Sequence, residues 1–111
     1  MKKHTLGLAL CISAGLWTFA GVAQAQAPTT QQVLYVKSLA ATCASCHGTD
    51  GKAVEGSQVV SLAGLDKNYL VTQMKAFKAG TRPATVMHQI SKGYSDAQID
   101  SIATYFAAQK K

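Results

Sequence analysis

The sequence predicts an all-α fold in a single domain, on three observations. Apolar residues recur at the three- and four-residue spacing of amphipathic helices, no stretch alternates as a strand does, and glycine-rich segments separate the helical patterns. A chain of 111 residues supports one core at most. Charged residues make up 14% of the sequence, below the roughly 25% that is usual, which excludes a disordered polyelectrolyte.

Residues 1–25 have the pattern of a cleaved secretory signal peptide, which leaves a domain over residues 26–111. Two lysines come first, an uncharged stretch over 5–22 follows, and the segment ends in a small-residue cleavage pattern, Ala23-Gln24-Ala25. A retained membrane anchor is the alternative, because the stretch approaches the roughly 20 residues of a span. The polar residues that follow favour cleavage.

Cleavage changes the composition on which any functional argument depends. It leaves 86 residues with nine Lys and Arg against five Asp and Glu, a net charge of +4, and only Cys43 and Cys46 of the three cysteines. Export predicts a periplasmic protein with no membrane span in the mature chain. That compartment argues against nucleic acid as the partner, in spite of the positive charge.

The first helix is expected over residues 30–42. Thr29 and Gln32 have the spacing of a capping box, in which two side chains satisfy free N–H groups at a helix start. One face of this helix is apolar and ends at a cysteine; its members are Val33, Val36, Ala40 and Cys43. Four glycines indicate a loop over 48–64.

A second helix begins at the cap residue Asp66 and extends to Lys78, before Gly80 ends it. Its inward stripe consists of Leu70, Met74 and Phe77. A short helix over 84–92 follows a connector and ends at Gly93.

The last helix opens at Ser95, which forms a second capping box with Gln98, and extends to Gln109. Its apolar side consists of Ile99, Ile102, Ala103 and Phe106. Four helices and long loops in so short a chain make a weak core, since small domains often need a disulfide or a bound group. An apolar group is therefore expected at the centre.

The segment Cys43-Ala44-Ser45-Cys46-His47 is C-x-x-C-H, the attachment signature of c-type haem. Two thiols at this spacing at a helix end form thioethers with the two haem vinyl groups, and the adjacent histidine donates an imidazole nitrogen to iron. A redox disulfide on a thioredoxin-like fold requires βαβ units, which the pattern lacks. A zinc site requires about four ligands, and His88 is the only remaining candidate. A structural disulfide would close a tight, strained loop.

The second axial ligand has three candidates: Met74, Met87 and His88. Met74 lies on an apolar helical stripe, where methionine usually fills the core. Adjacent helical residues point about 100° apart, so Met87 and His88 cannot both face the iron. The pattern favours Met87, because it follows Pro83 in a short segment before the last helix and can return over the second haem face, with His88 as a partly exposed surface residue. A distal thioether also raises the reduction potential, which suits an electron acceptor.

On these residues the chain resembles class I c-type cytochromes. The matching stretches are residues 39–48, which contain the haem motif, and Met87 with residues 90–99 and 102–106. Residues 75–99, above all 80–87, are similar to the single-haem cytochrome subunit of flavocytochrome c sulfide dehydrogenase. The first helix lacks the glycine that class I members often have at the helix crossing. The expected contact is therefore from Tyr35, Val36 or Leu39 to Ile102 and Phe106.

The resemblance implies a class I cytochrome c fold, about four helices around one covalently attached haem c. It implies an electron-transfer protein without catalytic residues of its own, in which Cys43 and Cys46 hold the porphyrin and His47 and Met87 fill the axial positions. An apolar shell is expected to exclude water; its members are Leu62, Leu65, Leu70, Phe77, Val86 and Ile90.

The resemblance also implies a partner, a flavoprotein that oxidises sulfide and passes electrons singly to the haem. A free periplasmic shuttle between other electron carriers is the alternative, and a ligand-binding or sensor haem has less support. Arg82 is a candidate for a propionate contact, with an ordinary exposed arginine as the alternative. Six lysines are candidates for a docking surface around the haem edge: Lys37, Lys52, Lys67, Lys75, Lys78 and Lys92.

Overall fold

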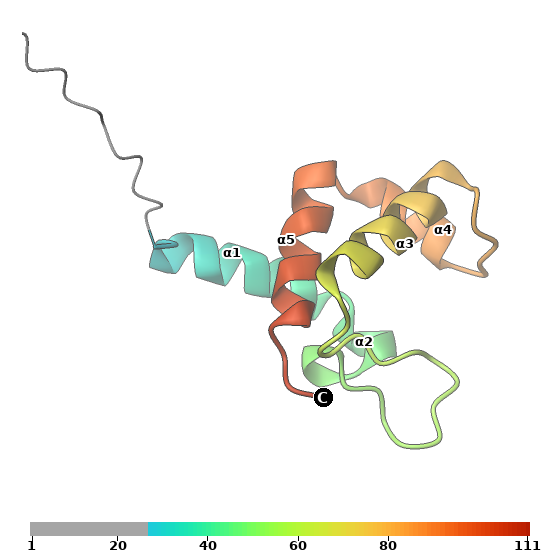
Figure 1. Ribbon diagram of the computed structural model, residues 1–111, viewed down its shortest axis with the longest axis horizontal. Coiled ribbons are helices and arrows are strands. Elements are labelled where there is room, and N and C mark those ends of the chain that lie inside the picture. Colours follow the sequence, from blue (N-terminus) through green and yellow to red (C-terminus); the bar gives the residue numbers. More distant parts are fainter. Residues whose placement is uncertain (1–26) are drawn as a thin grey trace, which may run out of the picture.

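The computed structural model describes residues 27–111, and all regular structure in this range is helical (Figure 1). The predicted signal peptide lies outside the described residues. No helix within 27–111 has the length and apolar character needed to cross a membrane. The elements in chain order are α1 (Thr30–Ala41), α2 (Ala44–His47), η1 (Thr49–Gly51), α3 (Lys67–Ala79), α4 (Met87–Ile90), η2 (Ser91–Gly93) and α5 (Asp96–Ala107).

The two helices at the ends of the described chain begin with the predicted capping boxes. The Thr29 hydroxyl accepts from the Gln32 N–H at 3.3 Å, and the Gln32 side chain accepts from the Thr29 N–H at 2.8 Å. Ser95 and Gln98 repeat this arrangement at the start of α5. Both helices end one or two residues before the predicted positions.

Helix α3 agrees with its predicted limits. The Asp66 carboxylate accepts from the Tyr69 N–H at 2.8 Å, and Gly80 ends the helix in a left-handed conformation with φ of 75°. Glycine suits this position because it has no Cβ to clash in that conformation.

The short helix predicted over 84–92 is smaller than expected. Only Met87–Ile90 is α-helical, and a 3₁₀ turn at Ser91–Gly93 follows it. Val86, which precedes the helix, has φ of −130° and ψ of −30°, so its backbone is neither helical nor extended. The β-branched side chains of Thr85 and Val86 lose rotamer freedom in a helix, which disfavours an earlier start.

The core lies where α5 crosses α1 and α3 (Figure 1). All four residues predicted on the apolar side of α5 are buried: Ile99, Ile102, Ala103 and Phe106. Ala40 and Leu70 form one buried cluster with Ile102, Ala103 and Phe106, and Leu39 packs against it. At the crossing with α5, the small side chain of Ala40 is buried in the core. Tyr35, one of the residues expected at this contact, does not pack inside, and its hydroxyl accepts a hydrogen bond from Gln98 at 2.8 Å.

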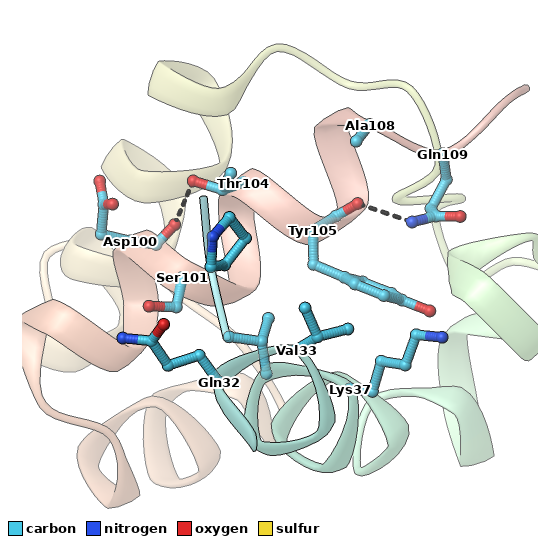
Figure 2. A pocket seen from close by; sticks show the side chains of 11 residues that line it. Gln32, Val33, Lys37, Asp100, Ser101, Thr104, Tyr105, Ala108 and Gln109 are labelled. Atoms are coloured by element: carbon cyan, nitrogen blue, oxygen red, sulfur yellow. Dashed lines mark hydrogen bonds between the residues drawn. The ribbon is translucent and has the colours of Figure 1, made fainter. Parts of the chain in front are cut away.

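The predicted apolar face of α1 is only partly correct. Ala40 is buried, but Val33 is 39% exposed because the N-terminal half of α1 extends past α5 (Figure 1). A groove of about 370 Å³ opens there between the two helices, with Val33 on one wall and Tyr105 on the other (Figure 2).

Candidate functional site

The C-x-x-C-H segment forms the single helical turn α2, directly after α1. Cys43 is the residue before this turn, and its carbonyl accepts from the His47 N–H at 2.9 Å. Cys43 is half-buried, Cys46 is exposed, and both are free thiols. Gly48 ends the turn with φ of 81°, and a Cβ there would lie 1.8 Å from the Lys52 carbonyl oxygen. The chain therefore requires glycine at this point.

The imidazole of His47 is buried, with 9% of the residue exposed. Its Nδ1 lies 2.7 Å from the Val60 carbonyl oxygen. A carbonyl only accepts, so Nδ1 carries the proton and Nε2 keeps a lone pair. A histidine fixed in this way through its other nitrogen is prepared to coordinate a metal.

The loop that supplies this carbonyl is fixed by a single main-chain atom. The Gly51 carbonyl oxygen accepts from the N–H groups of Leu62 and Ala63 at 2.7 and 3.1 Å, and from the Ser61 hydroxyl at 2.8 Å. Gly51 packs against Phe106 of α5, so the core positions the loop that orients His47. Sequence reasoning missed this role of Gly51 and Val60, because it involves main-chain atoms that no side-chain pattern reveals.

The structure decides between the readings of the two cysteines. Burial raises the pKa of the Cys43 thiol, and the neighbouring Cys46 raises it further against a lowering hydrogen bond from Thr42. Redox C-x-x-C pairs have a lowered thiol pKa, and their fold contains strands that residues 27–111 lack. Within residues 27–111, no group of three His, Cys, Asp or Glu is arranged so that it could hold a metal ion.

A cavity of about 400 Å³ lies beside the motif. Cys43, Cys46 and His47 form part of its wall, and Met74 and Met87 line it too. The remaining wall is mostly apolar and includes the whole predicted shell: Leu62, Leu65, Leu70, Phe77, Val86 and Ile90. A large apolar ring system attached through two thiols and one imidazole fits this donor set and this lining.

The three candidates for the second axial ligand differ in position. Met87 and Met74 line the cavity, and His88 does not. Nδ1 of His88 is buried without a hydrogen-bond partner. The Met74 sulfur accepts a hydrogen bond from the Ser91 hydroxyl at 3.6 Å, a contact that the sequence pattern gave no sign of.

The predicted basic residues fall into two groups. Arg82 lines the cavity, donates to the Gln73 side chain and stacks its guanidinium 4.5 Å from the centre of the Phe77 ring. None of the six candidate docking lysines lines the cavity. Three of them form ion pairs, Lys67 with Asp100 at 2.9 Å and Lys75 and Lys78 with Asp96 at 3.2 and 3.0 Å.

The motif, the cavity and the helical fold together define the class: a c-type cytochrome of class I with covalently attached haem c. Comparison with known proteins gives the family, because residues 33–110 match the cytochrome c family model. The chain therefore belongs to the cytochrome c family, and it is an electron carrier whose relatives are electron-transfer proteins rather than catalytic subunits.

Individual relatives are similar over most of this domain. The cytochrome subunit of sulfide dehydrogenase from Chlorobaculum tepidum is 41% identical over 73 residues, which are 66% of this chain and 64% of that protein. The thiosulfate dehydrogenase electron acceptor of Stutzerimonas stutzeri is 33% identical over 101 residues, 83% of this chain and 47% of that protein. The chain thus spans about half to two thirds of the length of these relatives.

A solved structure supports the fold. Cytochrome c4 of Acidithiobacillus ferrooxidans superimposes with a TM-score of 0.56 and 36% identity, over 60% of this chain and 37% of that one.

Proposed function

We propose that this chain is a periplasmic cytochrome in which Cys43 and Cys46 form the haem thioethers and His47 and Met87 are the axial ligands. The observation that carries the proposal is the single cavity that both cysteines, His47 and Met87 line together. Bound haem c supplies the one-electron couple of Fe(III) and Fe(II). Residues 1–25 are its cleaved leader. Mass spectrometry of the protein isolated from the periplasm is therefore expected to find Gln26 as the first residue.

The residues around the cavity favour electron transfer over ligand binding. The Val60 carbonyl orients His47, and the apolar lining keeps water away. Two protein ligands leave no open position for oxygen or peroxide. A thioether opposite an imidazole also raises the reduction potential, which suits an acceptor of electrons.

The ligand assignment is tested by paired substitutions. Met87→Ala is expected to abolish the weak sulfur-to-iron absorption band near the red end of the visible spectrum. Met74→Leu removes the other thioether that lines the cavity and is expected to leave the band intact. A band that survives in Met87→Ala and disappears in Met74→Leu would assign the ligand to Met74.

We propose further that the electron donor is a flavoprotein that oxidises sulfide. The cytochrome subunit of sulfide dehydrogenase from Chlorobaculum tepidum supports this, with 41% identity over 73 residues. Sulfide together with such a flavoprotein is expected to reduce the cytochrome within the turnover time of the flavoprotein, and the two proteins are expected to co-purify. Absence of both results would refute a flavoprotein subunit.

A free shuttle is the second candidate, and one specific observation favours it. The thiosulfate dehydrogenase electron acceptor of Stutzerimonas stutzeri aligns with 83% of this chain, the wider of the two overlaps. If the chain is a free shuttle, thiosulfate and a thiosulfate dehydrogenase are expected to reduce the cytochrome, and the two proteins are not expected to co-purify. Running both donor systems on one preparation separates the candidates.

A further inference from the structure

Two methionines line one cavity, although only one thioether is needed opposite His47. Met74 lies on α3 and Met87 lies on α4, so both come from elements that pack against each other. A site with two equivalent soft ligands would hold a mixture of coordination states. Something in the fold must therefore distinguish the two sulfurs.

Ser91 distinguishes the two methionines, because its hydroxyl bonds the sulfur of Met74 and not that of Met87. Its side chain is fully buried, with 0% of the residue exposed, and its hydroxyl donates to the Met74 sulfur at 3.6 Å. Within residues 27–111 this is the only hydrogen bond of that hydroxyl. Buried polar groups are nearly always paired, so the contact satisfies a hydroxyl that has no access to water.

The position of Ser91 in the chain joins the two methionines. Ser91 begins η2, directly after the α4 turn that carries Met87. One short segment therefore brings Met87 to the cavity and binds the sulfur of Met74. The hydrogen bond engages a lone pair of the Met74 sulfur, a weak acceptor, and favours the rotamer in which the bond is made.

We propose that Ser91 is a specificity-determining residue that restrains Met74 and so leaves Met87 as the axial ligand. The inference rests on the proposed function, in which Met87 binds the iron. Ser91 itself touches neither iron nor porphyrin in this role, since it acts through the Met74 sulfur.

The test uses imidazole as a competitor for the sixth iron position in the haem-loaded protein. Met87→Ala opens that position, and imidazole binds. Adding Ser91→Ala releases Met74, so imidazole is expected to bind roughly three to ten times more weakly, the range of one net hydrogen bond. The sulfur-to-iron band, absent from Met87→Ala, is expected to return in part.

A third variant separates ligand selection from a merely structural effect. Met74→Leu, added to Met87→Ala and Ser91→Ala, removes the competing sulfur and is expected to restore the imidazole affinity of Met87→Ala alone. Far-UV circular dichroism of all three variants reports the helical fold, and alanine at Ser91 adds no bulk to a buried site.

Equal imidazole affinity with and without Ser91→Ala overturns the role of Ser91 and leaves the axial role of Met87 intact. A weaker affinity that persists after Met74→Leu also overturns it, because the effect then bypasses Met74. A sulfur-to-iron band that survives in Met87→Ala alone overturns the axial assignment and the role of Ser91 together.

Discussion

The two sides of the cavity are stabilised in different ways. On the first side, residues 43–63 are fixed by main-chain groups: the Gly51 carbonyl accepts three hydrogen bonds, and the Val60 carbonyl orients His47. On the second side, residues 80–94 depend on side chains, including the Ser91 contact with Met74 and the Tyr94 contact with Thr42. Point substitutions should therefore perturb the second side directly, and the first side chiefly through packing.

The largest effect is expected from the packing that supports the first side. Phe106 is buried and contacts Gly51, so Phe106→Ala removes both core packing and the support of the loop. Truncation of a buried phenylalanine costs about 3–5 kcal/mol of unfolding free energy. Denaturant unfolding of the haem-loaded protein measures it, with Val54→Ala, at a side chain 76% exposed, as a control of little effect.

Gly51→Ala should be the next largest effect, because it disturbs the same support from the other side. Gly51 has φ of 76°, and a Cβ would lie 2.7 Å from the Phe106 ring and 3.0 Å from Leu62. Left-handed strain of about 1–2 kcal/mol adds to an overpacking cost of about 1–3 kcal/mol.

Gly56→Ala is the matched control for that substitution. Gly56 has a similar φ of 79°, but nothing lies within 4 Å of the position of its Cβ. The control therefore measures strain without collision. If the two variants unfold at the same denaturant concentration, the contact between Gly51 and Phe106 does not support the loop.

On the second side, one hydrogen bond connects chain segments 52 residues apart. The Tyr94 hydroxyl lies 2.6 Å from the Thr42 hydroxyl, and Thr42 itself bonds the Leu39 carbonyl at 2.7 Å. Tyr94→Phe keeps the ring and removes the bond, with an expected loss of about 1 kcal/mol. A double-mutant cycle with Thr42→Val measures the coupling; strictly additive losses would contradict it.

The smallest effect is expected from the dependence of stability on pH at Asp96, which lies just after the second side. Hydrogen bonds from Lys78 and Lys75 hold the pKa of the Asp96 carboxyl below its ordinary value of 3.8. The pairing therefore stabilises the protein at pH above that value, and the contribution is lost as pH falls through the lowered pKa. Asp96 is exposed, so the change is slight.

Thermal midpoints measured between neutral and acidic pH check this dependence. Asp96→Asn should unfold at a slightly lower temperature than the parent chain at neutral pH, with the difference vanishing in acid. A constant difference over the whole range would assign the effect to packing or helix capping instead of charge.

Helix limits were predictable where side chains mark them. Thr29, Ser95 and Asp66 cap helices through their own oxygen atoms, and Gly80 ends one through its conformation, so each is visible in the sequence. The start of α4 was not, because the pattern of apolar residues continues through Val86 although the backbone of that residue is not helical.

The candidate site divides in the same way. The haem motif and the apolar shell follow from residue type and spacing, and both reach one cavity. Val60 and Gly51 act through carbonyl oxygens that every residue possesses, so no composition indicates them. The contact between Ser91 and Met74 joins residues 17 positions apart on different elements, and only the tertiary structure brings them together.

The triple acceptor at Gly51 has a consequence for how this loop can vary. The chain from Gly51 to Val60 must have the length that places the Val60 carbonyl beside His47 while the Gly51 carbonyl keeps its hydrogen bonds. An exposed position such as Val54 tolerates exchange, since its side chain is no part of that path, whereas Gly56 has open space around it but a φ of 79° that favours glycine. Deletion or insertion of one residue would move the Val60 carbonyl away from the imidazole while preserving nearly every side chain. We therefore expect the position of His47 to depend on the length of this segment more than on its exposed side chains.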